Sequence, residues 1–474
     1  ATIKQRTRKI RIAARNLFVK RTLLQGLVMS LFSWTGSWHR YTKKVINQWT
    51  MMIEMTLWGR RPASGRSRFL FWHSVGTPDL HPGFALAFTA VKAEWNRLCR
   101  LQVGLPANRM CGPQIKLVLQ EWQWSITQGS MWVFPEGSCP TGWCSLKTLK
   151  RLAKSAWIRT MWKLDTKTTE PLSGQFPLLH IQQHGVGELS YYEKRVLIGA
   201  AIDARVLERL GSTMACHCGE TTPSREHVTF HCDVAAWSLP LRSSDERRLL
   251  VALVPQAEQV GFSQPEPNMK LVEFLKCHPS NHPLLAIDGS CLLTPAGQED
   301  WQRASWGIAA ADGPDFQGPV IGVEQTPHAG ERCALLHVCL ASHLANKPVQ
   351  ILCDNRAVFL RFQRGLEFDR WAGDLHCFWH YIRSLVIAGS SIVWIPSHGK
   401  NVTWTPPPGL SATLCRELNA RADRAANSAA TNWKAEFAKM QELHAEAVAW
   451  STHAFHLQVN NTMRFWRAML DMED

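Results

Sequence analysis

Two short apolar runs in the C-terminal third of the chain each end in an aspartate. Residues 284–287 (LLAI) run into Asp288, and residues 349–353 (VQILC) run into Asp354. A short apolar run that stops at a carboxylate is typical of a buried strand that presents the acid at its C-terminal end. The two runs therefore predict two core strands, each followed by a carboxylate at the edge of a sheet.

Two further acids lie on the apolar faces of helical patterns. Glu331 shares a face with Leu335 and Val338, and Asp423 shares a stripe with Ala426. A lone carboxylate on a packing face is costly to remove from water. Four such acids need a common reason, and we expect a divalent cation such as Mg²⁺, which prefers hard oxygen ligands.

The pattern between these acids predicts the other elements of an α/β domain over residues 280–432. Strict alternation of apolar and polar residues predicts strands, and spacings of three and four predict helices. Pro327 is suited to the first position of the helix that carries Glu331. The remaining expected elements are strands at 304–310, 319–325 and 391–396, helices at 356–364 and 371–386, and a final helix that carries Asp423.

The order Asp–Glu–Asp–His–Asp in this context of strands and helices resembles the type 1 ribonuclease H domain. The matching positions are Asp288 in IDGS, Glu331 in the ER of the first long helix, Asp354 in CDN, His398 in PSHGK and Asp423 in LNARADRAAN. All five come in order, with the expected elements between them. The resemblance implies a ribonuclease H-like domain over 280–432, with a mixed five-stranded sheet and flanking helices.

The resemblance also implies an activity, namely metal-dependent hydrolysis of the RNA strand in RNA–DNA hybrids. Two Mg²⁺ ions, for which Mn²⁺ would substitute, would activate a water and neutralise the leaving oxygen. Asp288 would bridge both ions. Glu331 and Asp354 would hold the ion near the leaving group, and Asp423 the ion near the nucleophile. His398 would relay protons or assist product release, because histidine titrates near neutrality.

Three residues beside these acids are candidate substrate contacts. Ser290 and Asn355 could hydrogen-bond the 2′-hydroxyls that a hybrid duplex presents in its wide, shallow minor groove. Arg332 could reach a phosphate. The arginines within 356–370 could carry the duplex backbone, and an ordinary solvated helix face is the other interpretation of them.

The charge of the chain is uneven and points to a polyanion. The 474 residues, enough for roughly two to four domains, have a formal net charge of +15. Residues 1–68 contain fifteen Lys and Arg and a single acid, Glu54. This imbalance favours nucleic acid as a partner, and a solvated helix face is the alternative.

Apolar residues at helical spacing predict helices over 1–60 and 84–103. This basic helical block, residues 1–112, resembles the thumb-like region that follows the polymerase palm in reverse transcriptases of non-LTR retrotransposons. The sequence has no YxDD-type palm motif. If the parent protein is a polymerase, its catalytic core is expected upstream of residue 1.

A segment rich in cysteine and histidine, residues 211–240, precedes the acids. Its candidate ligands are Cys216, Cys218, His227 and Cys232. Three thiolates and an imidazole suit a tetrahedral, structural Zn²⁺, and the segment resembles the zinc-binding segment found between polymerase and ribonuclease H in non-LTR retroelement proteins. The first pair is Cys-x-Cys where that pattern often has Cys-x-x-Cys, so His217 and His231 are alternative ligands. A loop without metal is the other interpretation.

The remaining segments carry no visible chemistry. They are expected to form a connecting region at 113–210 with helices at 146–162 and 191–210, a linker at 241–279 with a helix at 269–276, and a helical tail at 433–474. Fourteen scattered cysteines favour reduced thiols in the cytosol or nucleus over secretion. The longest apolar run, residues 22–34, is too short to cross a bilayer, so we expect no membrane partner.

Three functional hypotheses follow from these patterns. The first is a hybrid-specific endoribonuclease that belongs to a retroelement-derived protein. The second is a catalytically idle retroelement remnant that only binds nucleic acid. The third is a transposase or integrase, which would use a set of three acids. The glutamate on the first long helix and the PSHGK histidine favour the first hypothesis.

Overall fold

The protein is described by a computed structural model that covers two folded bodies. The described residues are 2–14, 16–35, 41–58, 72, 77–107, 112–127, 130–166, 219, 266–292, 294, 301–364, 375–396, 404–442, 445 and 463. The helix predicted at 191–210 lies outside them, as do most of the linker at 241–279 and most of the tail at 433–474.

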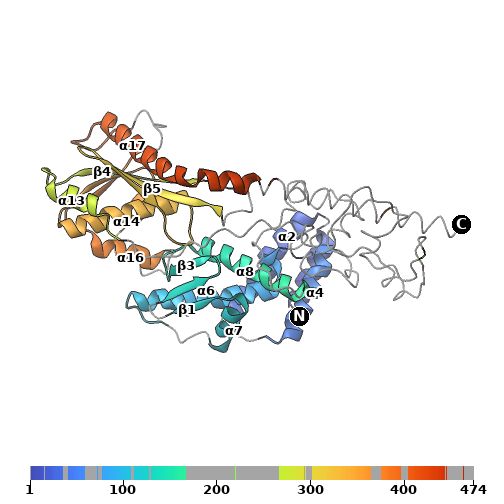
Figure 1. The fold of residues 1–474 in the computed structure, drawn as a ribbon. Helices are drawn as coiled ribbons and strands as arrows, with labels where there is room; N and C mark the ends of the chain where they lie inside the picture. The colour runs from blue at the N-terminus through green and yellow to red at the C-terminus, as the bar shows by residue number, and fades with distance from the viewer. Residues whose placement is uncertain are drawn as a thin grey trace.

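A five-stranded mixed sheet forms the centre of the C-terminal body (Figure 1). Its strands are β4 (Leu284–Leu292), β5 (Arg303–Ala310), β6 (Asp315–Pro319), β7 (Gln350–Cys353) and β8 (Ser391–Trp394), in the order β6-β5-β4-β7-β8. β4 is antiparallel to β5 and parallel to β7, and β7 is parallel to β8. The predicted fold class is confirmed, in the order of elements that the ribonuclease H resemblance requires.

Helices cover both faces of this sheet. They are α13 (Met269–Cys277), α14 (Pro327–Ala345), α15 (Arg356–Gln363), α16 (His376–Leu385) and α17 (Ala412–Ala430). Leu285 and Ile287 of β4 pack in one core with α13, α14 and α16, whereas Ala286 packs in a second core with α17. This period of two explains why β4 is apolar throughout: it is buried on both faces.

The beginning of α14 follows the capping rules. The Thr326 hydroxyl accepts a hydrogen bond from the Ala329 N–H at 3.1 Å, and Pro327 takes the first helical position as predicted. The helix ends at Ala345 and is capped by Asn346, which is left-handed with φ +48°. Glu331, the second of the four acids in the sequence, therefore lies in the second turn of a well-capped helix.

The third strand differs from the prediction. The sequence pattern predicted it at 319–325, but β6 ends at Pro319 and residues 320–326 form a loop. Val320 and Val323 are buried, so their apolar character reflects packing rather than strand pairing. The Gln325 amide replaces the missing ladder: it accepts from the Ala304 N–H at 2.7 Å and donates to the Val320 and Gly322 carbonyls at 2.9 and 2.8 Å.

The N-terminal body is mainly helical, with one small sheet. Its helices include α1 (Thr2–Ala13), α2 (Leu17–Leu24), α3 (Ser30–Thr35), α4 (Lys43–Trp58), α6 (Pro82–Gln102), α7 (Gly112–Trp122) and α8 (Leu146–Thr166), and its sheet consists of β1 (Ser125–Thr127), β2 (Met131–Phe134) and β3 (Gly137–Pro140). One core joins Phe84 and Trp95 to Trp132 and Leu149. Residues on both sides of position 112 thus share a core, and the boundary expected there stays a prediction.

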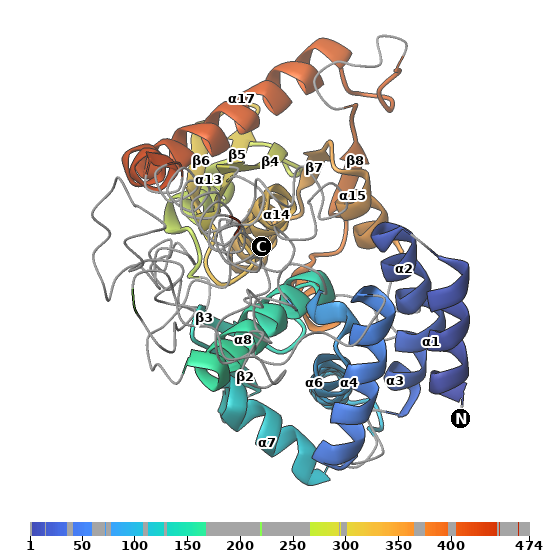
Figure 2. The ribbon, with the colours of Figure 1, turned by 90° about the vertical axis from the view of Figure 1, so that its right-hand side faces the viewer.

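The two bodies are in direct contact. Cys377 of α16 and Val323 belong to the core of the N-terminal body, and the Phe378 N–H donates to the Gly142 carbonyl at 3.2 Å. Figures 1 and 2 show α17 on the face of the sheet that is turned away from the N-terminal body, with α14 on the near side. None of the described helices combines the length and the apolar character that a bilayer crossing requires.

Candidate metal centre

Strand register brings the first two acids to neighbouring positions. β4 and β7 are parallel neighbours, with Ile287 opposite Cys353. Asp288 and Asp354 each follow this pair, so they lie at the same level on adjacent strands. The Gly289 N–H donates to Asp288 Oδ1 at 2.7 Å, and Trp394 Nε1 donates to the Asp354 carbonyl at 3.0 Å. The first contact orients the Asp288 carboxylate, and the second holds the backbone that presents Asp354.

Two glycines allow α14 to approach this edge of the sheet. A Cβ atom on Gly289 would lie 2.3 Å from the backbone nitrogen of Glu331, and one on Gly330 would lie 2.3 Å from the Ser305 carbonyl oxygen. Contacts of this length between a side chain and backbone do not occur, so only glycine permits the crossing. The residue after Gly330 is Glu331, which is thereby brought beside Asp288.

Three carboxylates meet at this crossing. One oxygen each from Asp288, Glu331 and Asp354 lies within 4.8 Å of the others. Asp288 is 6% exposed and Glu331 is 8% exposed, so both acids are removed from most water. Glu331 Oε2 is buried and has no hydrogen-bond partner among the described residues. Buried carboxylates of this kind need compensation by a cation or by protons.

The fourth acid, Asp423, approaches from α17 but is not within this group of oxygens. Gly307 lies opposite Asp288 in β5, and a Cβ there would lie 2.2 Å from the Ala422 carbonyl oxygen. This second close crossing brings α17 against the sheet next to Asp288. The charge of Asp423 contributes to the raised pKa of Asp288.

Electrostatics mark the group as an unbalanced negative cluster. Burial, together with the charge of Asp354, raises the pKa of Asp288 from 3.8 to about 7. Burial raises the pKa of Glu331 from 4.5 to about 8, against the opposing effect of a hydrogen bond from Asn355. Hard oxygen donors that converge and repel one another suit Mg²⁺ or Mn²⁺. The residues present therefore fit a divalent cation of this class.

Asparagine amides lie next to the acids and hydrogen-bond them, and these contacts were not predicted from the sequence. Asn419 Nδ2 lies 3.4 Å from Asp354 Oδ2, and Asn427 Nδ2 donates to Asp423 Oδ1 at 2.9 Å. Two of these contacts could have been predicted from the sequence, because Asn419 and Asn427 are four residues before and after Asp423 and share its helical face. Asn355 contacts both Glu331 and His328.

The predicted substrate contacts have different environments. Ser290 lies beside the acids, where its hydroxyl donates to Asn427 Oδ1. Asn355 caps α15 by accepting from the Ala357 and Val358 N–H groups. Both stay predictions as contacts to a hybrid.

The predicted phosphate contact of Arg332 stays a prediction, and in the structure this side chain is paired within the protein. Its side chain is 4% exposed and forms an ion pair with Glu324 at 2.8 Å. Its guanidinium carbon also lies 5.8 Å from the ring centroid of Phe378. Because the side chain of Arg332 lies on a different face of α14 from that of Glu331, it is turned towards the N-terminal body.

Several predicted site residues lie outside the described part of the chain. They are His398 and the four candidate zinc ligands, Cys216, Cys218, His227 and Cys232. Their proposed roles stay predictions.

Comparisons with known proteins give likenesses to ribonuclease H structures. No family model and no curated protein matches the chain. The PFV RNase H domain is 18% identical, with 32% of this chain and 95% of that one covered and a TM-score of 0.27. RNase H1 from the halophilic archaeon Halobacterium salinarum is 19% identical, with 32% and 98% covered and a TM-score of 0.21.

A third likeness covers more of the chain. The foamy viral protease–reverse transcriptase in complex with RNA/DNA hybrid is 12% identical, with 65% of this chain and 52% of that one covered and a TM-score of 0.25. At these identities and scores, the assignment of function has to rest on the residues of this chain.

Proposed function

We propose that this chain is a metal-dependent nuclease that hydrolyses the RNA strand of RNA–DNA hybrids. The observation that carries the proposal is the convergence of Asp288, Glu331 and Asp354, from β4, α14 and the end of β7, to within 4.8 Å. Two of these acids are buried, and their pKa values are raised. Perturbed acids in such a group are typical of a functional site.

The four acids divide naturally between two cations. Asp288, Glu331 and Asp354 would hold one, and Asp288 with Asp423 would hold the other. When bound, Mg²⁺ or Mn²⁺ would supply an activated water and charge compensation for the phosphate and the leaving oxygen. The acids must give up their protons to serve as ligands. The raised pKa values of Asp288 and Glu331 mean that deprotonation and cation binding are coupled.

The neighbouring amides would keep the acids in position. Asn355 donates towards Glu331, and Asn419 lies next to Asp354. An amide that donates to one carboxylate oxygen leaves the other oxygen available for a cation. His398 would move a proton near the leaving group or assist product release, as the resemblance to ribonuclease H implies.

Choice of an RNA–DNA hybrid would depend on groups that contact the minor groove. Ser290 and Asn355 flank the acids, and they are the candidates for contacts with 2′-hydroxyls, which distinguish RNA from DNA. The basic N-terminal helices would add attraction to the phosphate backbone that does not depend on sequence. The resemblance of residues 1–112 and 211–240 to segments of non-LTR retroelement proteins favours an origin in a retroelement protein. An upstream polymerase domain would then be the partner.

The direct test is cleavage of an end-labelled RNA–DNA hybrid in Mg²⁺, with duplex DNA and duplex RNA as comparison substrates. We expect the RNA strand of the hybrid to be cut, and the Asp354→Asn variant to be inactive. If wild type and variant cut equally, a contaminating nuclease is responsible and the proposal fails. Binding of the hybrid that weakens with salt but gives no cleavage would support the idle nucleic-acid-binding remnant instead.

A further inference from the structure

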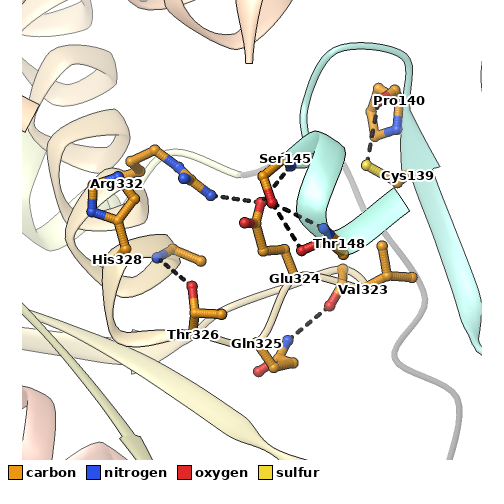
Figure 3. A network of polar contacts seen from close by, with 12 residues as sticks. Cys139, Pro140, Ser145, Thr148, Val323, Glu324, Gln325, Thr326, His328 and Arg332 are labelled. Carbon is orange, nitrogen blue, oxygen red and sulfur yellow. Dashed lines mark hydrogen bonds and ion pairs between the residues drawn. The ribbon is translucent and has the colours of Figure 1, made fainter. Parts of the chain in front are cut away.

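A buried ion pair joins the helix of the candidate metal centre to the N-terminal body (Figure 3). Glu324 lies in the loop before α14 and is 10% exposed, and Arg332 lies on α14 and is 4% exposed. Glu324 Oε2 accepts from Arg332 at 2.8 Å and from the backbone N–H of Ser145 at 3.0 Å. One carboxylate thus contacts both bodies.

On the side of the N-terminal body, this contact is made by Ser145, the residue just before α8. Its hydroxyl accepts from the Thr148 N–H at 3.1 Å and its carbonyl from the Leu149 N–H at 2.9 Å, so it caps the N-terminus of α8. A helix N-terminus attracts negative charge, which adds to the stabilisation of Glu324. Arg151, one turn further along α8, donates to the Val323 carbonyl at 3.2 Å. The loop before α14 is therefore held by the first two turns of α8.

The Arg332–Glu324 pair affects the metal centre because Arg332 is next to Glu331 in the chain. Arg332 follows Glu331 directly, and successive residues of a helix differ by about 100° around its axis. Glu331 therefore turns into the acid group while Arg332 turns towards α8. Because Arg332 is anchored at its guanidinium, it restrains rotation of the first turns of α14 about the helix axis. Such a rotation would move the Glu331 carboxylate away from Asp288.

We propose that Glu324 and Arg332 are positioning residues for the metal centre. By holding the start of α14 against α8, they fix Glu331, so that the cation affinity of the acids depends on the docking of the N-terminal body. This inference rests on the proposed metal-dependent function. It assigns a part in that function to two residues that touch neither the substrate nor the cation.

The test compares two buried ion pairs of similar exposure in the full chain. Glu324→Gln breaks the pair at the joint. Glu136→Gln breaks the pair of Glu136 with Arg159, which lies within the N-terminal body with side chains 9% and 8% exposed. Mg²⁺ is titrated while thermal unfolding is followed, and hydrogen exchange of residues 327–336 is measured without metal.

We expect both variants to lower the melting temperature. Only Glu324→Gln should raise the Mg²⁺ concentration at half-maximal stabilisation, by about tenfold, as is usual for residues that support metal ligands. It should also accelerate exchange over 327–336. Arg332→Lys retains a charge at the joint and should give an intermediate Mg²⁺ midpoint. If Glu324→Gln does not fold, the Mg²⁺ midpoint of Arg332→Lys tests the inference in its place.

Equal Mg²⁺ midpoints and equal exchange over 327–336 in both Gln variants would overturn the inference and leave the pair a merely structural contact. If Mg²⁺ does not stabilise the wild type, the proposed function fails. The exchange measurement still reports whether the pair fixes α14, so the two failures are distinguishable.

Discussion

Glu331 and Arg332 are adjacent on α14, yet they lie in two opposite kinds of buried environment. Glu331 joins Asp288 and Asp354 in a group of like charges, where its pKa is raised to about 8. Arg332 joins Glu324 in a compensated pair that is further stabilised by the N-terminus of α8. Compensated buried charges are typical of structure, whereas an uncompensated cluster stores unfavourable energy that a ligand can release.

The largest expected effect distinguishes these two environments by mutation. Asp288→Asn should reduce hybrid cleavage by roughly 10³-fold, because it removes a cation ligand. The same change should raise the melting temperature of the metal-free protein at pH 8, because it removes a desolvated charge from a repulsive group. Hybrid cleavage and differential scanning calorimetry in EDTA measure the two effects. A variant that loses both activity and metal-free stability would show that the aspartate is structural.

The close approach that creates the acid group can be tested at Gly330. A Cβ at this position would lie 2.3 Å from the Ser305 carbonyl oxygen of β5 and 2.8 Å from the Gly289 Cα of β4, so Gly330→Ala should force α14 away from the sheet. We expect a loss of about 1–3 kcal/mol of unfolding free energy, as for an overpacked core, together with weaker Mg²⁺ stabilisation. The matched control is Gly26→Ala, since a Cβ on Gly26 has no neighbour within 4 Å. Equal unfolding curves for both variants would contradict the close contact between α14 and the sheet at Gly330.

The pH dependence of stability should reveal the like-charge group directly. Without metal, folded Asp288 and Glu331 keep protons up to about pH 7 and 8, whereas the unfolded chain releases them near their ordinary values of 3.8 and 4.5. The folded state therefore binds more protons across this window. By linkage, the free energy of unfolding should fall as pH rises from about 4 to about 8, by on the order of 4 kcal/mol for each of the two acids.

Urea unfolding in EDTA at several pH values would measure this slope. The double variant Asp288→Asn, Glu331→Gln should lose it, because neither side chain titrates. A wild-type slope equal to that of the double variant would mean that the two acids are solvated as ordinary surface carboxylates are.

Much of the candidate site was predictable from periodicity. The two apolar runs before Asp288 and Asp354 predicted two core strands, each followed by a carboxylate, and β4 and β7 are these strands; their parallel pairing was not predicted. Pro327 indicated where α14 begins, and the spacing of Glu331 from Leu335 and Val338 placed it on the packing face of this helix. These features depend on local patterns, which a sequence displays directly.

Other features depend on contacts that no local pattern reports. The sequence did not show that Arg332 pairs with Glu324, because this pair is completed by the α8 N-terminus, which comes from a distant part of the chain. The apolar stretch at 320–325 looked like a strand, but it is a loop, and the Gln325 amide bonds the Val320 and Gly322 carbonyls in it and the Ala304 N–H of β5. A side chain that replaces a neighbouring strand leaves no periodic signal.

The most direct test of the central claim is the effect of Mg²⁺ on the thermal stability of the full chain at pH 8. If the four acids form a cation site, saturating Mg²⁺ should raise the melting temperature of the wild type by roughly 5 °C, since a ligand that binds only the folded state stabilises it. Asp288→Asn should show almost none of this rise. A wild-type melting temperature that does not respond to Mg²⁺, or an equal rise in the variant, would contradict the site.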